Sequence, residues 1–280
     1  MILIDMNQIA VANLMMNLKM NNSKTVDESM VRHMILNSIR MYRKEHHSEY
    51  GEVVLTWDSK HSWRRDYYPE YKAGRRKGRE ESDLNWDDIF GTLNKIRNEI
   101  KQNFPYKYLE VFGAEADDII GFLCEENRDE KIIIISGDKD FIQLQKYTNV
   151  KQWSPITKKD VNGFNPTTYL KEHILRGDTS DGVPNVLSPD NTFVDGLRQR
   201  PLSRKKIQSW LLGGGSDWND EVKRNFQRNL TLIDLTQTPE ELKNQIRLEY
   251  NNAPHGDRSK LLNYFMKNKL KELTENIGEF

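Results

Sequence analysis

Nine carboxylates are the residues of this 280-residue chain whose types and spacing could do chemistry. Each follows or adjoins an apolar, strand-like run, or lies in a tight loop: Asp5, Asp58, Glu115, Asp117, Asp118, Asp138, Asp140, Asp178 and Asp181. Side chains at the carboxyl ends of adjacent parallel strands meet in one crevice. Because like charges repel there unless cations lie among them, oxygen ligands of this kind favour hard divalent ions such as Mg²⁺ or Mn²⁺.

Single members of this set are weak evidence, since an Asp after a strand is usually a helix cap or turn residue. Acidic residues in the first turn of a helix, as at 115–118, also complement the helix dipole. Two glycine-aspartate turns are more specific, at 137–140 and at 177–181, because glycine permits a sharp turn and each turn carries two acids. Taken together, the groups favour a metal site over capping.

Two divalent ions about 4 Å apart can activate water and stabilise the leaving oxygen in phosphodiester hydrolysis. No Ser/His/Asp set or cysteine nucleophile competes with this chemistry. The single cysteine, Cys124, is expected to be a buried structural thiol. The histidines follow no metal-ligand spacing, and we interpret all six as structural or exposed: His33, His46, His47, His61, His173 and His255.

A basic and aromatic segment indicates the substrate. Between Lys60 and Arg79 there are eight Lys or Arg against two acids, interleaved with aromatic rings, so the formal net charge of zero averages over strong local asymmetry. Rings can stack on bases while cations follow phosphates, which suits a single strand. The predicted nucleic-acid contacts are Arg64, Arg65, Tyr71, Lys72, Arg75, Arg76, Lys77 and Arg79.

Strand and helix signals alternate along the first half of the chain, with strands expected at 1–5, 52–57, 106–112, 131–136 and 149–153 and helices at 26–44, 86–103, 115–127 and 139–145. Residues 60–83 show no clear period. Only helices are expected later, at 166–176, 203–213, 217–230, 239–250 and 258–275. This pattern predicts an α/β fold with a mainly parallel central sheet flanked by helices, a helical arch and a C-terminal helical region. We divide it into a nuclease core, residues 1–165 with arch segment 60–83, and a helical DNA-binding region, residues 166–280.

Charged residues make up 30% of the chain and hydrophobic residues 36%. No apolar run approaches the ~18 residues of a membrane span, and no export signal opens the chain. We therefore expect no membrane association and a cytoplasmic location.

In their order along the chain, these motifs resemble those of the 5′-nuclease (flap endonuclease) superfamily, and most closely its ribonuclease H branch of T-even bacteriophages. The resemblance spans nearly the whole sequence. It is carried by Leu3-Ile4-Asp5, Trp57-Asp58, Trp63 to Lys72, Glu115 to Asp118, Ser136 to Phe141, Val150 to Pro155 and Gly177 to Pro184.

The resemblance implies a Mg²⁺-dependent 5′→3′ exonuclease and flap endonuclease with two ions, for which Mn²⁺ is a plausible substitute. Its expected role is the removal of RNA primers during DNA replication. Expected substrates are flapped or nicked duplex DNA and RNA–DNA hybrid. The enzyme is expected to be a monomer in the host cell cytoplasm. Single-strand-binding protein, contacted by the C-terminal helices, and a replication clamp are candidate partners.

By motif position, the first metal cluster would comprise Asp5, Asp58, Asp117 and Asp138, with Glu115 and Asp118 adjoining it. Asp140, Asp178 and Asp181 would form the second, partly through water. The catalytic set would be Arg64, Lys72 and Asp138, with both cations at the scissile phosphate, while Tyr71 would stack a base.

One departure from the family lies after Pro184, where the glycine-rich hairpin that grips duplex DNA is absent. Its monovalent-cation site is therefore in question. The grip could be replaced by Arg198, Arg200, Arg204, Lys205 and Lys206, but a solvated loop is an equal alternative.

Three rival functions are less well supported. A haloacid dehalogenase-type phosphatase would need a second acid where the chain has Asn7. A PIN-type endoribonuclease would lack the arch and the long helical half. A non-enzymatic nucleic-acid-binding protein would be expected to have lost some of the nine carboxylates.

Overall fold

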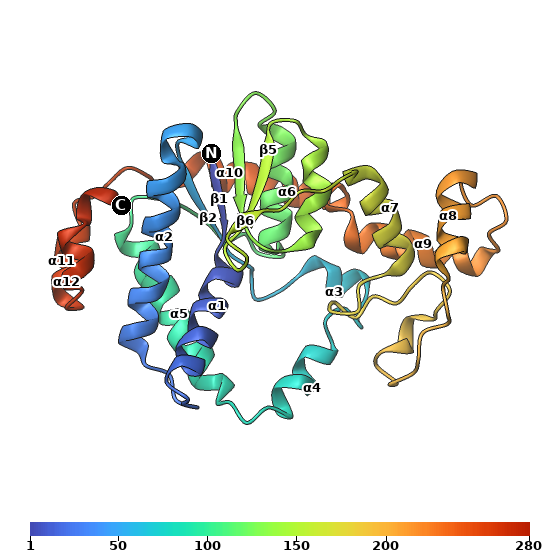
Figure 1. Ribbon diagram of the computed structural model, residues 1–280, viewed down its shortest axis with the longest axis horizontal. Coiled ribbons are helices and arrows are strands. Elements are labelled where there is room, and N and C mark those ends of the chain that lie inside the picture. Colours follow the sequence, from blue (N-terminus) through green and yellow to red (C-terminus); the bar gives the residue numbers. More distant parts are fainter.

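One six-stranded sheet organises the computed structural model, which describes residues 1–280 (Figure 1). The strand order is β3-β2-β1-β4-β5-β6, and all neighbours are parallel except β5 and β6. Ile2 lies opposite Val53 on one side and Ile133 on the other. The strands are β1 (Ile2–Asp5), β2 (Val53–Thr56), β3 (Lys107–Leu109), β4 (Ile132–Ile135), β5 (Val150–Ser154) and β6 (Lys159–Asp160). The mainly parallel sheet expected from the sequence is confirmed.

Helices cover both faces of the sheet because alternate strand residues point to opposite sides. Ile2 and Ile4 enter one core, and Leu3 enters the other. The first core is closed by α1 (Met6–Met20), α2 (Glu28–Tyr50), α5 (Trp86–Asn103), α11 (Leu261–Lys267), α12 (Lys271–Glu275) and the following η4 (Ile277–Glu279). The second is closed by α6 (Ala116–Glu126), the 3₁₀-helix η1 (Lys139–Lys146), η3 (Leu235–Gln237) and α10 (Glu240–Asn252). Cys124 is buried in this second core, as expected.

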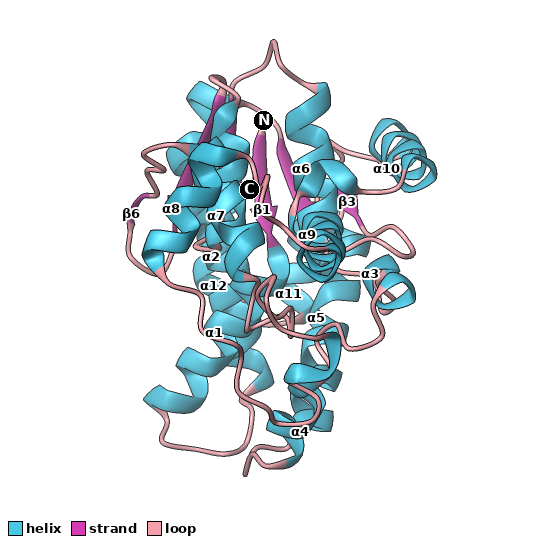
Figure 2. Cartoon of the chain, turned by 90° about the vertical axis from the view of Figure 1, so that its right-hand side faces the viewer, coloured by secondary structure: helices cyan, strands magenta, loops and turns pink.

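Residues 60–83, the arch, run between β2 and α5 and contain two short helices, α3 (Trp63–Tyr67) and α4 (Gly74–Glu80). Helix α4 has no buried residue and lies far from the strands in two perpendicular views (Figures 1 and 2). The middle of the arch is anchored, because Tyr68 and Tyr71 are buried against Ile174 and Leu232.

The remaining helices form a group at the right of Figure 1, where α7 packs against η1 and α9 packs against η3. Its members are α7 (Pro166–Arg176), η2 (Asp190–Thr192), α8 (Arg204–Gly213) and α9 (Asp220–Ile233). Trp210 and Val222 join α8 and α9 in a small core of their own, and Ile174 joins α7 to the anchored part of the arch. No helix in the structure is both long enough and apolar enough to cross a membrane.

Three local expectations differ from the structure. Helix α1 was not predicted, since its apolar residues do not share one face: Leu14 and Leu18 are buried while Met16 and Met20 are exposed. The single helix expected over 258–275 is two helices, because Lys269 adopts a left-handed backbone with φ 56°. Sequence reasoning also did not find the short antiparallel strand β6.

Candidate active site

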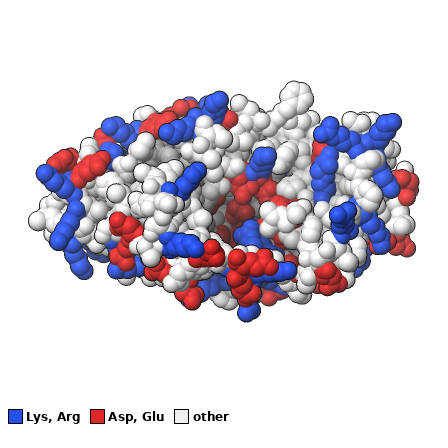
Figure 3. All heavy atoms as spheres, turned by 60° about the horizontal axis from the view of Figure 1, so that its bottom comes forward, with Lys and Arg blue, Asp and Glu red and all other residues white.

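The carboxyl ends of three adjacent strands bring acidic residues together. Asp5 ends β1, Asp58 follows β2 after one residue, and Asp138 follows β4 after two. Asp117 reaches the same place from the first turn of α6. Figure 3, viewed from the side of the arch, shows carboxylate atoms gathered in a hollow near the centre of that face. We call this hollow the acidic crevice.

Hydrogen bonds from Ser136 and from the first turns of α1, α6 and η1 fix three of these four carboxylates. Asp5 accepts from the Ser136 hydroxyl at 3.0 Å and from the backbone N–H of Gln8 at 3.1 Å. Asp58 accepts from the backbone N–H of Ala116 at 2.7 Å, and Asp138 accepts from that of Asp140 at 2.9 Å. The Asp117 carboxylate has no hydrogen-bond partner in the protein.

Burial and mutual repulsion raise the pKa values of these acids. Burial raises the pKa of Asp5 to about 7, and the neighbouring Asp58 and Asp138 add to the rise. The pKa of Asp117 is raised well above its usual range by burial and then by Asp138 and Asp5. Burial and then Glu115 raise that of Asp58. Carboxylates that destabilise one another in this way, one of them without a partner, are what a site for divalent cations requires.

A second group contains a histidine. His173 Nδ1 lies 3.3 Å from Asp140 Oδ1, and His173 Nε2 lies 3.5 Å from Asp178 Oδ2. The three residues offer ligand atoms that all lie within 4.8 Å of one another. Burial alone would lower the pKa of His173, but its contacts with Asp178 and Asp140 outweigh that effect and raise it. Burial raises the pKa of Asp140 to about 7, although His173 acts against the rise.

Our interpretation of His173 as structural or exposed therefore missed its position between two predicted metal ligands. The sequence carried one signal, since His173 stands only five residues before Asp178 on the helix that leads into the glycine-aspartate turn. The histidine spacings that are typical of metal sites describe ligands close together in the sequence. The partners of His173 come instead from the glycine-aspartate turn and from η1.

Lys72 joins Glu115 to Asp181, the remaining acid of the turn. Its Nζ lies 2.7 Å from Glu115 Oε1 and 3.5 Å from Asp181 Oδ2. Its backbone N–H donates to the Asp181 carbonyl at 2.8 Å, and its φ of 57° is rare for a non-glycine residue. Burial acts to lower the pKa of Lys72, but Asp181 and Glu115 raise it on balance, so the ammonium stays charged.

Arg64, by contrast, is buried away from solvent with only 2% of its side chain exposed. Its Nη1 donates to Asp118 Oδ2 at 2.9 Å and to Glu115 Oε2 at 3.3 Å, and its Nε donates to the Leu232 carbonyl at 2.9 Å. Asp118 also accepts from the Thr238 hydroxyl at 2.8 Å and is itself fully buried. In this structure Arg64 and Asp118 thus form an internal ion pair, which differs from the phosphate contact and metal contact expected of them.

Tyr71 also differs from expectation. Its ring is buried, and its hydroxyl lies 2.8 Å from both Glu115 Oε2 and Asp181 Oδ2. A ring held in this way is not free to stack on a base. Tyr71 instead links the arch to the same two acids that hold Lys72.

The other predicted nucleic-acid contacts are exposed, except for Arg79, which is partly buried. In α4, Arg75 pairs with Asp181 at 2.6 Å, and Arg76 and Lys77 pair with acids one turn later. Arg79 lies over the Phe90 ring, 5.6 Å from its centroid. Exposed residues outside α4 are Arg65 in α3 and Arg204, Lys205 and Lys206 in the first turn of α8.

Comparison with known proteins places this geometry in context. The 5′-3′ exonuclease N-terminal resolvase-like domain matches residues 1–173, and the T4 RNase H C-terminal domain matches residues 166–280. Ribonuclease H of Enterobacteria phage T4 is 36% identical over 296 residues, covering 99% of this chain and 95% of that protein. A 5′-3′ exonuclease of Buchnera aphidicola subsp. Schizaphis graminum is 28% identical over 161 residues, covering 54% of this chain and 53% of that protein.

Two solved structures share the fold. A T5 5′-exonuclease with bound zinc ions has a TM-score of 0.62 at 15% identity, covering 90% of this chain and 98% of that one. A bacteriophage T5 flap endonuclease, solved with DNA and metal ions, has a TM-score of 0.62 at 17% identity, covering 89% and 97%.

Proposed function

Because this chain belongs to the 5′-3′ exonuclease family, as its ordered motifs predicted, we propose that it is a divalent-metal-dependent 5′→3′ exonuclease and flap endonuclease. The observation that carries the proposal is the convergence of Asp5, Asp58, Asp117 and Asp138 at the strand ends, with pKa values raised by burial and repulsion in three of them. Such a site favours bound cations over water.

We propose two ions, with Mg²⁺ as the physiological metal. Asp5, Asp58, Asp117 and Asp138 would hold the first ion, and Asp140, Asp178 and the nearby His173 would hold the second. Bound there, divalent ions would activate a water molecule and stabilise charge on the phosphate oxygens. A nitrogen ligand in the second group suits Mn²⁺ better than Mg²⁺, which supports Mn²⁺ as an effective substitute.

Lys72 is the proposed catalytic cation. It is charged, positioned by Glu115 and Asp181, and close enough to the acids to stabilise negative charge that develops on the phosphoryl oxygens. Arg64 acts as a positioning residue, because it holds Glu115 and Asp118 while touching no solvent.

The proposed substrate is a flapped or nicked duplex or an RNA–DNA hybrid, whose 5′ single strand is admitted beneath the arch. The exposed cations of α4 would contact its phosphates, and those at the start of α8 would contact the duplex. Removal of RNA primers during replication in the host cytoplasm, and contacts with single-strand-binding protein and a replication clamp, belong to the same proposal.

A cleavage assay tests this proposal. We expect the protein to cleave a 5′-labelled flapped duplex and an RNA–DNA hybrid with Mg²⁺ and to lose all activity in EDTA. Asp138→Asn should abolish turnover while leaving DNA binding largely intact, because it removes one carboxylate from the ion site. Cleavage that persists in EDTA, or its absence with both Mg²⁺ and Mn²⁺, would refute the mechanism.

A further inference from the structure

An exposed aromatic ring lies beside the acidic crevice. Phe112, in the loop between β3 and α6, is 77% exposed. It stacks on the ring of His61, with 5.6 Å between the ring centroids and 17° between the ring planes. The imidazole covers one face of the Phe112 ring, and the high exposure leaves the other face open to solvent. We call these two residues the aromatic platform.

The loops that carry the platform are fixed to each other. Ser59 Oγ donates to the His61 carbonyl at 2.8 Å and accepts from the backbone N–H of Gly113 at 3.1 Å. The backbone N–H of Ser59 donates to the Ala114 carbonyl at 3.0 Å. His61 Nε2 lies 2.7 Å from Asp66 Oδ2, which holds the orientation of the imidazole. The platform is therefore formed before any ligand binds, so little conformational entropy is lost when a ligand stacks on it.

The platform lies close to the acids that are expected to bind metal. His61 follows Asp58 by three residues, and Phe112 precedes Glu115 by three. Because a chain spans at most ~3.6 Å per residue, the Cα of His61 lies within about 11 Å of the Cα of Asp58. Successive nucleotides of one strand advance about 3.4 Å in duplex DNA, so this distance corresponds to about three nucleotides.

The charges around the platform favour nucleic acid as its ligand. Lys60 directly precedes His61, and Arg65 directly precedes Asp66; both cations are exposed, and neither forms an ion pair in the structure. Cations beside an open ring suit a nucleotide, whose phosphates they contact while the ring stacks on the base. A protein partner would need a contiguous apolar patch, whereas the preceding Val111 is buried.

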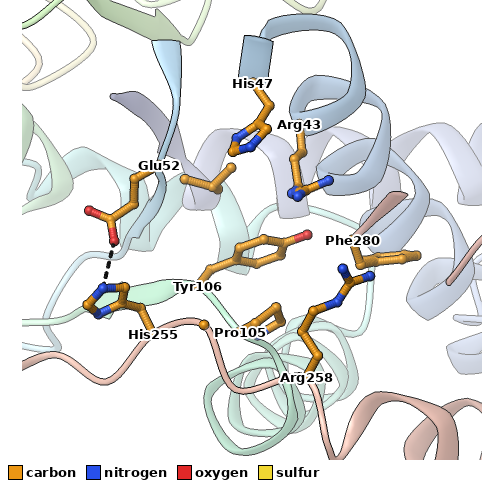
Figure 4. A pocket seen from close by; sticks show the side chains of 10 residues that line it. Arg43, His47, Glu52, Pro105, Tyr106, His255, Arg258 and Phe280 are labelled. Atoms are coloured by element: carbon orange, nitrogen blue, oxygen red, sulfur yellow. Dashed lines mark ion pairs between the residues drawn. The ribbon is translucent and has the colours of Figure 1, made fainter. Parts of the chain in front are cut away.

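A pocket at the other end of the same strands is not an alternative place for this base. Its walls include Glu52, just before β2, and Pro105 and Tyr106, just before β3 (Figure 4). The acidic crevice lies beyond the carboxyl ends of these strands, so the strands themselves separate the pocket from the crevice. The buried ring of Tyr71 is not free to stack either, and the platform offers the open ring face that Tyr71 lacks.

We propose that the aromatic platform stacks one unpaired nucleobase of the 5′ strand, within about three nucleotides of the cleaved phosphate. This inference rests on the proposed nuclease function and adds a substrate contact to it. Phe112 supplies the open ring face, His61 holds that ring in place, and Lys60 and Arg65 contact the adjoining phosphates. Because every base has a π face, the platform recognises an unpaired nucleotide without reading its sequence.

Binding of a flapped duplex in EDTA, measured by fluorescence anisotropy, tests the contact without cleavage. Phe112→Ala should weaken binding roughly 5- to 100-fold, the effect of losing one stack between a base and an aromatic ring. Phe112→Trp should retain the wild-type affinity, because it keeps an aromatic face. The melting temperature of Phe112→Ala should equal that of the wild type, since the ring is largely exposed. Phe164→Ala is the matched control, as it removes an exposed ring without a ring partner from the loop between β6 and α7.

Abasic substrates locate the contact along the strand. One nucleotide at a time, on either side of the flap junction, is replaced by an abasic site. In the wild type, one abasic position in the 5′ strand should weaken binding by about the same factor as Phe112→Ala. The variant should be insensitive at that position, because the two changes remove the same interaction and their effects do not add.

Two results would overturn the proposal. One is equal affinity of the wild type and Phe112→Ala for every substrate, even if the wild type cleaves flaps with Mg²⁺ as expected. The other is sensitivity only to abasic sites in the complementary strand, which would assign the ring to a paired base. Absence of cleavage by the wild type with Mg²⁺ and Mn²⁺ would refute the nuclease function, and the abasic series in EDTA would still decide whether the platform binds a base.

Discussion

Lys72 is the residue whose substitution should separate binding from chemistry. Its ammonium is held by Glu115 and Asp181 at the edge of the acids that are expected to bind metal. Lys72→Met should lower the single-turnover rate constant about 10²- to 10³-fold and change the DNA dissociation constant much less, because its charge acts mainly on the transition state. Rapid quench and fluorescence anisotropy measure the two quantities. Lys131→Met, an exposed lysine at the other end of the sheet, is the control. An equal loss in both quantities would contradict the assignment.

The raised pKa of Asp5 predicts how stability changes with pH. A neutral Asp5 is favoured in the folded protein, so its contribution to stability is fully present below pH ~4 and is lost as pH rises toward about 7. In EDTA, Asp5→Asn and the wild type should melt alike near pH 4, and the variant should melt a few degrees higher at pH 8. Saturating Mg²⁺ at pH 8 should reverse this order, because only the wild type keeps the ligand. A difference that stays constant with pH would contradict this view of Asp5.

The predictability of individual site residues followed their place in the fold. Residue type and spacing were enough to predict that the acids at the strand ends lie close together, because the carboxyl ends of parallel strands meet at one edge of the sheet. The sequence did not reveal that the side chains of Arg64 and Tyr71 point into the protein. Both residues belong to the arch, and whether an arch side chain points outward or inward depends on packing against Glu115 and α9. His173 was missed for the same reason, as its partners come from other elements.

The turn between α7 and Val183 shows how one element positions the second group of ligands. Gly177 has a φ of 69°, and an added Cβ would lie 2.3 Å from the Val183 carbonyl oxygen. Gly177→Ala should therefore cost roughly 3 kcal/mol or more in unfolding free energy and displace Asp178, which weakens Mn²⁺ binding. Chemical denaturation and calorimetry measure the two effects.

Gly196→Ala provides the matched control for this turn. Its φ of 67° imposes the same backbone strain, but nothing lies within 4 Å of the added Cβ. We expect a cost of about 1–2 kcal/mol and unchanged metal binding. Equal effects of the two substitutions would show that backbone strain alone, and not the close approach to Val183, defines the turn.

Elements with a strong apolar period were predictable, and elements defined by context were not. The strands of the parallel sheet and helix α5 carry their burial pattern in the sequence. The sequence of helix α1 does not show its burial pattern, because some of its methionines are exposed to solvent while others are buried in the core. The division of 258–275 into two helices depends on the left-handed backbone of Lys269. A lysine in the sequence does not indicate that conformation.

At the scale of the whole molecule, the two hydrophobic cores draw on both ends of the chain. Leu261, Phe265, Leu273 and Phe280 complete the core that contains Ile2 and its strand neighbours. Leu235 and Leu242 complete the core on the other face of the sheet. The helical region after residue 165 is therefore part of what supports the strand ends, and so of what supports the acidic crevice.

This arrangement predicts that damage to the last helices destabilises the entire sheet. Leu273 in α12 is fully buried, whereas Leu262 in α11 is 47% exposed. Leu273→Ala should lower the unfolding free energy by about 2–5 kcal/mol, because it leaves a cavity in a core shared with β1 and β2. Leu262→Ala should change it by no more than about 0.5 kcal/mol.

Which parts of the protein lose stability in Leu273→Ala distinguishes two models of the C-terminal helices, one in which they unfold together with the sheet and one in which they unfold separately. If they share one cooperative core with the sheet, Leu273→Ala should lower a single melting transition, and hydrogen exchange in β1 should speed up together with exchange in α12. Nuclease activity at low temperature should be kept, since no group in the crevice is touched. A separate early transition confined to residues 261–280, with β1 protected as in the wild type, would instead show that the last helices fold on a finished core and contribute nothing to holding the strand ends in place.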